Sequence, residues 1–252
     1  MRSHRKPELL LALISRCVSA LPRIPLIEDL TKGSVPPGSN ILVEFDPLSQ
    51  WYNASLTIAA GWLQTGGNVS YIAHSQPPDE IRSQLRSLGL PLDELEQNDR
   101  FWITDLYSAS VGQKSKEKYA LGSLKVADLS LYIAREAMAD SPAPEFLVVV
   151  DNGSVLDRFN EERAWVELYL TRPFPMGKSR QLTQLTGFMN GVHSNWAYKQ
   201  LEAAVDGVVE FKLDEASDPA QNLFRIRNLR KAGFDGRWHP LKIGENFEVT
   251  LE

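Results

Sequence analysis

The segment NILVEFDPLSQWYN, residues 40–53, reads as a buried strand that continues directly into a helix. Its residues 41–43, Ile-Leu-Val, form the continuous apolar run that is typical of a strand covered on both faces. A helix is expected over 47–63, because Asp46 can cap its amino end and Pro47 suits its first turn. One strand followed at once by one helix is the repeating unit of α/β folds.

The same alternation continues along the chain. We predict strands over 69–73, 101–107, 146–150, 207–213, 223–230 and 247–251, and helices over 77–88, 123–139, 161–170 and 195–204. The stretch 172–192 contains prolines and glycines without a regular apolar period, so no element is predicted there. Strands separated by helices form a parallel sheet with helices on both faces, and the last strands, which lack such helices, should pair antiparallel at one edge. The predicted fold class is therefore α/β, a doubly wound, mostly parallel sheet.

Composition restricts the class of protein. The 252 residues fit one large domain, and the single cysteine, Cys17, excludes an internal disulfide and a cysteine-based zinc site. A net charge of −5 argues against a general nucleic-acid binder. No apolar run approaches the ~18 residues that a membrane span needs. We expect a cytoplasmic protein that does not contact a membrane.

The amino-terminal residues loosely resemble a secretory signal, with a basic start followed by an apolar stretch. Arg16 interrupts the apolar part, and Leu10, Leu13 and Ile14 recur at helical spacing. We therefore expect residues 1–25 to form a helical extension that packs on the domain or on a partner. The main domain is expected over 26–252.

The turn after the first strand can be compared with a phosphate-binding loop, the Walker A motif. In that loop, glycines let backbone N–H groups approach the phosphates, a lysine reaches them, and Ser or Thr holds magnesium. Here Phe45 and Gln50 stand at the glycine positions, Trp51 at the lysine position and Tyr52 at the Ser/Thr position. The aromatic side chains would fill the vacated volume. A triphosphate bound in the usual pose is not expected.

Five blocks frame this turn. They are VPPGSNILV (35–43), LQTGGNVSYIAHSQPPDEIRSQLRSLGL (63–90), FLVVVD (146–151), GVHSNWAYKQLEAAVDGVVEFKL (191–213) and FRIRNLRKAGFDGRWHPLKI (224–243). These blocks, in this order, cover most of residues 33–252. Through them the chain resembles the KaiC-like branch of the RecA-type ATPases, as a degenerate member without the Walker A loop. The block at 191–213 is the most specific. The resemblance implies a RecA-like fold and a ring, usually a hexamer, that binds ATP between subunits.

The resemblance also implies roles for single residues. Asp151 matches the acidic residue that helps to hold the magnesium–water shell. The alternative is that Asp151 caps its own turn at 151–154, and we favour this structural role. Residues 74–76, His-Ser-Gln, stand where the family has acidic residues that activate water. Arg230 matches the arginine of a Lys/Arg pair offered to a neighbour's phosphates, and the lysine is lost. Asp151 and Arg230 are thus the nucleotide-binding candidates, if nucleotide and magnesium bind at all.

Two other groups of residues deserve a chemical interpretation. Arg225, Arg227, Arg230 and Lys231 form a basic cluster, which we interpret as a solvated edge strand or an inter-subunit salt-bridge row, with a nucleic-acid contact as the alternative. The histidines lack metal-ligand spacing, so no metal site is predicted.

A triad of Ser154, His193 and Asp151 can be written down. No G-x-S-x-G elbow supports it, and no catalytic residue is predicted. His193 is expected to hold a loop by hydrogen bonds.

These observations predict a non-catalytic, KaiC-like pseudo-ATPase that acts as a scaffold or regulatory subunit. It would work through a homo-oligomer, or through a protein partner such as a related ATPase. Two alternatives stay open. The first is a nucleotide-binding sensor or weak ATPase with an altered binding mode. The second is a nucleic-acid-binding module that uses the strip from Arg225 to Lys231.

Overall fold

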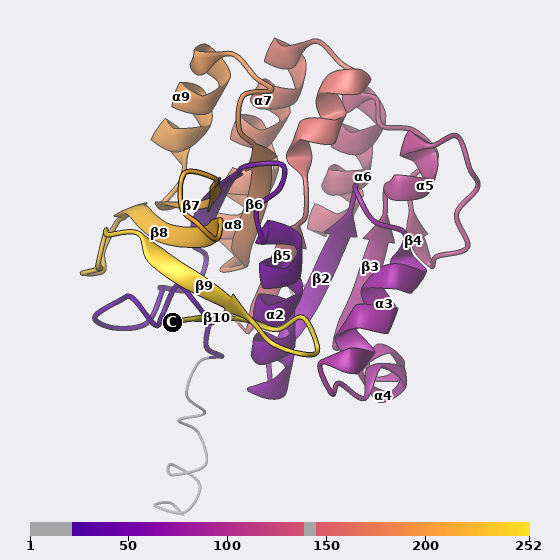
Figure 1. Cartoon of the computed structure of the whole chain (residues 1–252). Helices are drawn as coiled ribbons and strands as arrows, with labels where there is room; N and C mark the ends of the chain where they lie inside the picture. Colours follow the sequence, from indigo (N-terminus) through magenta and orange to yellow (C-terminus); the bar gives the residue numbers. More distant parts are fainter. Residues whose placement is uncertain (1–21, 139–144) are drawn as a thin grey trace, which may run out of the picture.

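The computed structural model describes residues 22–138 and 145–252 (Figure 1). The predicted helical extension over 1–25 therefore lies almost wholly outside the described residues. The described part contains a ten-stranded sheet in the order β10-β9-β8-β7-β1-β6-β5-β2-β3-β4.

The strands are β1 (Asn40–Phe45), β2 (Asn68–Ala73), β3 (Phe101–Asp105), β4 (Tyr119–Ala120), β5 (Phe146–Val150), β6 (Thr183–Met189), β7 (Gly207–Asp214), β8 (Gln221–Leu229), β9 (His239–Ile243) and β10 (Val249–Leu251). The helices are α2 (Trp51–Gln64), α3 (Pro78–Ser87), α4 (Leu92–Gln97), α5 (Tyr107–Ser110), α6 (Val126–Met138), the 3₁₀ helix η1 (Gly153–Arg158), α7 (Glu162–Thr171), α8 (Pro173–Arg180) and α9 (Asn195–Ala204).

The strand directions confirm the predicted fold class. β1 pairs in parallel with β6 and β7, and β5, β2, β3 and β4 continue the parallel arrangement on the far side of β6. β8 pairs antiparallel with β7, and β9 and β10 follow antiparallel. The antiparallel strands thus form the C-terminal edge of the sheet, as expected for strands without intervening helices.

One prediction is wrong at the centre of the sheet. The stretch 172–192, where no element was expected, contains α8 and β6, and β6 lies between β1 and β5. The sequence of β6, TQLTGFM, shows no regular apolar period, because its polar residues are buried together with its apolar ones. Gln184 is satisfied there by tertiary contact, its Nε2 donating to the Pro173 carbonyl at 2.8 Å. β9 and the short helix α4 were missed as well.

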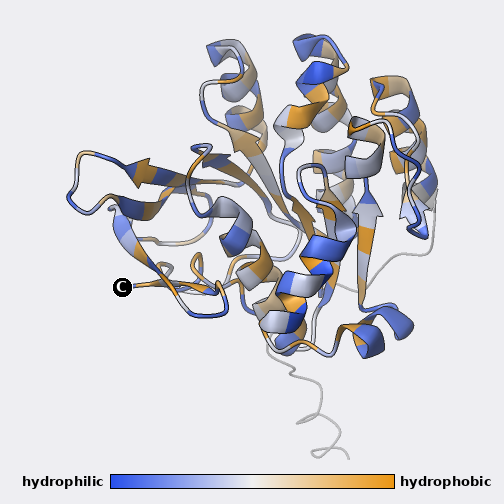
Figure 2. Ribbon diagram, turned by 45° about the vertical axis from the view of Figure 1, so that its right-hand side comes forward, coloured by the Kyte–Doolittle hydropathy of each residue, from blue (hydrophilic) through white to orange (hydrophobic). Residues whose placement is uncertain are grey.

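Helices cover both faces of the sheet. On β1, Ile41, Val43 and Phe45 contribute to a core that includes residues of α2, α3 and α4, whereas Leu42 contributes to the core with α7 and α9. This alternation follows from the two-residue period of a strand. Figure 2 shows hydrophobic residues along the central strands and hydrophilic residues on the loops. Ile24 is also buried in the first core, two residues before the predicted domain start at 26.

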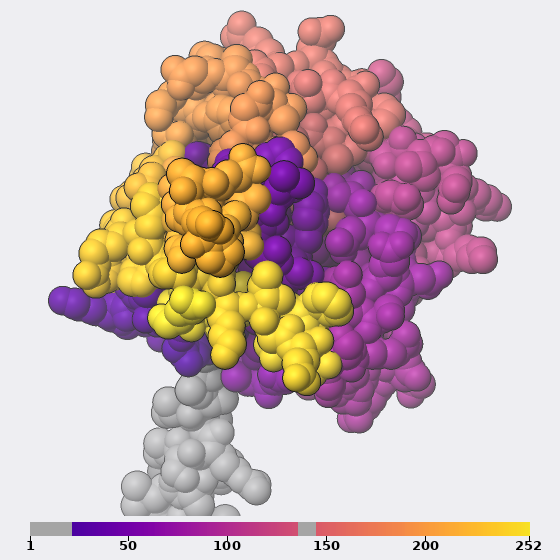
Figure 3. Space-filling model, in the orientation of Figure 1, coloured from indigo at the N-terminus to yellow at the C-terminus, as the bar shows by residue number. Residues whose placement is uncertain are grey.

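The C-terminal strand β10 lies against helix α2. The Val249 backbone N–H donates to Thr57 Oγ1 on α2 at 3.0 Å. In Figure 3 the yellow C-terminal atoms form one continuous surface with the indigo residues near the start of the chain. In the described ranges, no helix combines the length and apolar character required to cross a bilayer.

Replacing Phe188 by Ala should lower the free energy of unfolding by about 3–5 kcal/mol, because a buried aromatic side chain leaves a cavity. Phe188 is fully buried on β6 and stacks on Trp165 with 5.3 Å between ring centroids. Phe247 is 58% exposed, and its replacement by Ala should change the free energy by less than about 0.5 kcal/mol. Urea denaturation measures both variants, and equal losses would contradict this core.

Candidate functional site

The candidate site lies at the edge of the sheet where parallel strands end. β1, β6, β5 and β2 are neighbours and run in the same direction, so their carboxyl ends meet at this edge. Open α/β sheets bind ligands in the crevice outside such strand ends. The turn over residues 46–50 joins β1 to α2 there.

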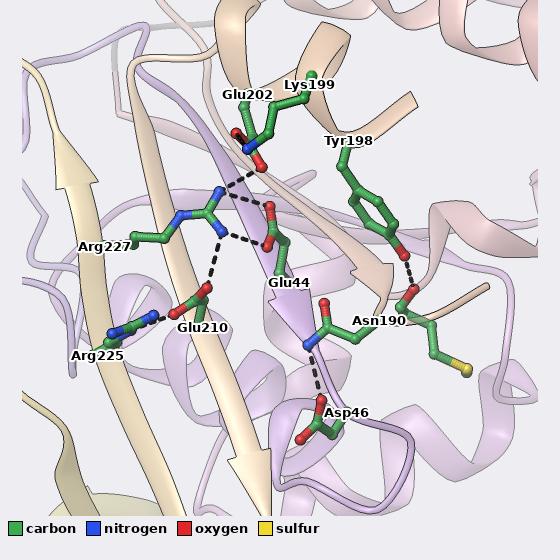
Figure 4. Close-up of polar contacts among 10 residues, drawn as sticks. Glu44, Asp46, Asn190, Tyr198, Lys199, Glu202, Glu210, Arg225 and Arg227 are labelled. Carbon is green, nitrogen blue, oxygen red and sulfur yellow. Dashed lines mark hydrogen bonds and ion pairs between the residues drawn. The ribbon is translucent and has the colours of Figure 1, made fainter. Parts of the chain in front are cut away.

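This turn differs from its prediction. α2 begins at Trp51 rather than at Pro47, and its N-cap residue is Gln50. Asp46 therefore does not cap the helix. Its carbonyl accepts from the Ser49 backbone N–H at 3.0 Å, and its carboxylate accepts from Asn190 Nδ2 at 2.9 Å (Figure 4). Hydrogen bonds within the turn and to the end of β6 outweigh the capping preference of Asp-Pro.

Trp51 fills the space beneath the turn. Its side chain is fully buried, and its indole Nε1–H donates to the Asp151 carbonyl at 2.6 Å. Its ring lies 6.2 Å from the ring of Phe45 and 5.5 Å from that of Phe211, between centroids. Gly187 makes this packing feasible, because a Cβ there would lie 2.5 Å from both Trp51 Nε1 and the Asp151 carbonyl oxygen.

Tyr52 and Gln50 form further ties at this edge. The Tyr52 hydroxyl donates to Ser75 Oγ at 3.2 Å and accepts from Asn152 Nδ2 at 3.1 Å. Burial raises the pKa of Tyr52 above its ordinary value, so the phenol is neutral. Gln50 Oε1 accepts from Asn53 Nδ2 at 2.7 Å, within the first turn of α2.

Asp151 is fully buried after β5, and its carboxylate holds the chain after β2. One carboxylate oxygen accepts from the His74 backbone N–H at 2.8 Å, and the other accepts from the Ser75 backbone N–H at 3.0 Å. The prediction that Asp151 caps its own turn is wrong. Asn152 does so, with its Oδ1 accepting from the Ser154 backbone N–H at 3.1 Å.

Within one chain, Arg230 lies near the amino ends of the parallel strands, opposite to their carboxyl ends. β8 runs antiparallel to β7, so its last residue, Leu229, pairs with Gly207 at the start of β7. Arg230 follows and donates through Nη2 to the Ala203 carbonyl at 3.1 Å. The fold of one chain therefore does not bring Asp151 and Arg230 together. Lys231 comes next in an exposed turn with a φ of 70°.

The other two arginines of the basic cluster form a network of ion pairs (Figure 4). Arg227 Nη1 donates to Glu44 at 2.9 Å and to Glu210 at 3.0 Å, and Nη2 lies 2.7 Å from Glu202. Arg225 donates through Nε to Glu210. The network links β1, β7, β8 and α9.

This geometry revises the interpretation of the cluster. Arg225 and Arg227 share one face of β8, as predicted, but β8 lies between β7 and β9 and is not an edge strand. Their ion pairs lie within the chain rather than between subunits. Arg225 also lies over the Trp238 ring, with Cζ 4.3 Å from its centroid. The two guanidinium groups are thus neutralised by neighbouring carboxylates.

A third group surrounds His193, whose side chain is fully buried. Its Nε2 lies 2.8 Å from Ser154 Oγ, and its Nδ1 lies 3.9 Å from both Asp157 Oδ1 and Glu162 Oε1. Burial lowers the pKa of His193, against the opposing effect of the two carboxylates. Sequence reasoning paired Ser154 and His193 with Asp151. It missed the nearby acids because they come from η1 and α7, far from His193 in sequence.

Burial also controls the charge of Glu44. It raises the pKa of this carboxyl from 4.5 to about 7, against the opposing charge of Arg227, which three carboxylates share. A carboxyl whose folded pKa exceeds its unfolded value stabilises the fold at low pH. That stability is fully present below the unfolded pKa and is lost as the pH rises through the folded pKa.

The free energy of unfolding of the wild type should therefore fall relative to Glu44→Gln, by about 2 kcal/mol between about pH 5 and about pH 8. Denaturant titration across that range measures the difference. Glu245→Gln is the matched control at an exposed position, and its difference from the wild type should not follow this trend. A pH-independent effect of Glu44→Gln would show that the carboxyl is ionised throughout.

The chain is similar in sequence to two UPF0273 proteins. The chain is 21% identical to a UPF0273 protein from Thermotoga maritima, covering 87% of this chain and 90% of that relative. It is 23% identical to a UPF0273 protein from Pyrococcus horikoshii, covering 87% and 88%. Among solved structures, a KaiC-like protein from Pyrococcus horikoshii matches with a TM-score of 0.69 and 16% identity, covering 92% of this chain and 97% of that one.

A second solved structure is the flagellar accessory protein FlaH from Methanocaldococcus jannaschii. It matches with a TM-score of 0.67 and 13% identity, covering 92% of this chain and 99% of that one. At these identities the solved structures support the fold. A family model described as "ATPase: KaiC" matches residues 24–250, nearly the whole described chain. The chain therefore belongs to the KaiC family of ATPases.

Proposed function

We propose that this KaiC-family chain lacks a working phosphate loop and serves as a scaffold or regulatory subunit rather than as an ATPase. The observation that carries the proposal is the buried indole of Trp51. It stands at the position of the phosphate-binding lysine and donates its N–H to the Asp151 carbonyl. A lysine there would extend toward phosphate oxygens, whereas this indole is committed to packing and to a protein acceptor.

The acidic side chains near Trp51 also support the proposal that no nucleotide is hydrolysed here. Phosphoryl transfer depends on positioned cations and N–H donors around the transferred group. Both oxygens of Asp151 already accept backbone N–H groups, so a magnesium–water shell would have to compete with them. Asp46 adds a carboxylate just after β1, which disfavours a triphosphate there.

Side chains around this edge favour contact with another protein. Leu48 in the turn is 69% exposed, and Val192 and Trp196, before and at the start of α9, are 47% and 42% exposed. Exposed large apolar side chains commonly mark interaction surfaces, and tryptophan is enriched at their energetic centres. A second copy of the chain, or a related family member, is the proposed partner. A cytoplasmic location stays a prediction.

Nucleotide binding in an altered pose is the second candidate function. A cleft of about 430 Å³ opens beside the turn and is lined by Tyr52, Tyr107, Asn152 and Arg158, among other residues. Aromatic faces and one cation could hold a nucleoside phosphate without a phosphate loop. The nucleic-acid alternative has less support, because Arg225 and Arg227 are paired with carboxylates.

Calorimetric titration with Mg·ATP tests the proposal, with the oligomeric state measured by light scattering on the same sample. We expect no saturable heat up to about 1 mM nucleotide, a limit that corresponds to only about 4 kcal/mol of binding free energy. A self-associated state is expected in the same sample unless a separate partner chain is required. Saturable binding would contradict the proposal that this chain does not bind ATP. Loss of that binding in Arg158→Gln would assign the nucleotide to the cleft.

The packing role of Trp51 has its own test. Trp51→Phe keeps an aromatic ring but leaves the buried Asp151 carbonyl without its indole donor, which should cost about 1–3 kcal/mol of unfolding free energy. Trp196→Phe is the matched control, because Trp196 is 42% exposed and its loss should cost less than about 0.5 kcal/mol. Guanidinium denaturation measures both. Equal stability of Trp51→Phe and wild type would contradict the packing role.

A further inference from the structure

Three side chains from separate segments converge beside α7. Asp157 lies on η1, Glu162 begins α7, and His193 lies in the loop between β6 and α9. One oxygen of each carboxylate and one imidazole nitrogen all lie within 4.8 Å of one another. His193 Nδ1 faces both acids, at 3.9 Å from each.

His193 Nδ1 is a buried polar atom that makes no hydrogen bond to any described residue. A distance of 3.9 Å is too long for a hydrogen bond to either carboxylate. The other nitrogen, Nε2, is engaged with Ser154 Oγ at 2.8 Å, and Ser154 Oγ also accepts from the Met189 backbone N–H at 2.9 Å. A buried nitrogen without a partner is costly. Its position between two carboxylates favours a bound cation.

Each of the three side chains is oriented by a further hydrogen bond. Trp165 Nε1 donates to Asp157 Oδ1 at 3.2 Å. The Ser194 backbone N–H and hydroxyl donate to the two oxygens of Glu162 at 2.8 and 2.5 Å. Such outer hydrogen bonds are the usual means by which proteins fix metal ligands. They also show that neither acid depends on His193 for its orientation.

We propose that Asp157, Glu162 and His193 bind a divalent first-row metal ion, with Zn²⁺ as the representative. An imidazole nitrogen with two carboxylate oxygens suits this class better than Mg²⁺ or Ca²⁺, which prefer oxygen alone. Tetrahedral bonds of 2.0–2.1 Å place ligand atoms roughly 3.3 Å apart. His193 Nδ1 and each carboxylate must therefore approach by about 0.6 Å, and the two carboxylates, which lie within 4.8 Å, by up to about 1.5 Å. The Asp157 and Glu162 side chains are 39% and 27% exposed, so they have room to move.

The site is open to solvent on one side. Asp157 also lines the cleft of about 430 Å³, so a water molecule can complete the coordination from there. A Ser154–His193–acid catalytic triad is the rival assignment. It requires a short hydrogen bond from Nδ1 to the acid, whereas both distances are 3.9 Å.

The first test is calorimetric titration of Zn²⁺ into the untagged, metal-stripped full-length chain. We expect one equivalent to bind in the micromolar range or tighter, and His193→Gln to weaken binding at least tenfold. The glutamine amide can keep the hydrogen bond to Ser154 while Nδ1 is lost. His239→Gln is the matched control, because His239 also lies near an acid, Asp235, at 3.5 Å. It should bind as the wild type does.

Unchanged Zn²⁺ affinity in His193→Gln, or no binding by the wild type, would overturn the proposal. If His193→Gln does not fold, Asp157→Asn replaces it, because this side chain is partly exposed and the amide keeps its size. The visible spectrum with Co²⁺ is the second measurement. Intense tetrahedral bands in the wild type that disappear in Asp157→Asn would support the site. The weak spectrum of hydrated Co²⁺ in both proteins would refute it. Neither result depends on whether ATP binds.

Discussion

The indole of Trp51 joins the turn after β1 to the end of β5, and the arrangement of the whole carboxyl edge depends on that contact. Its N–H donates to the Asp151 carbonyl, and the missing side chain of Gly187 leaves room for it. Asp151 in turn holds the start of the chain after β2 through two backbone N–H groups. Three strand ends are thereby connected through one buried side chain and one buried carboxylate.

Charged side chains form a connected network on one side of this edge. On the side of β7 and β8, Arg227 forms ion pairs with Glu44, Glu210 and Glu202. Burial raises the pKa of Glu44 to about 7. Arg225 also pairs with Glu210 and Lys199 with Glu202, so the three carboxylates of this network face three cationic side chains.

Much of the fold could be predicted from local pattern. The apolar runs of β1 and β5, the helical periods of α3, α7 and α9, and the blocks shared with the family were readable because each depends on neighbours in sequence. β6 could not be read, because its polar residues Thr183, Gln184 and Thr186 are buried by the strands and helices around them. The start of α2 was misplaced for a related reason, since Asn190 at the end of β6 binds the carboxylate expected to cap the helix.

The sequence by itself determined the strand–helix alternation, the family and the absence of glycine and lysine from the turn after β1, because these are properties of residue order. Only the tertiary structure decided what the remaining side chains do. It separated Asp151 from Arg230, paired Arg225 and Arg227 with carboxylates, and assembled Asp157, Glu162 and His193 into one cluster. The physical reason is that hydrogen bonds, ion pairs and metal coordination depend on distances of a few ångströms between residues far apart in sequence, which sheet topology alone establishes.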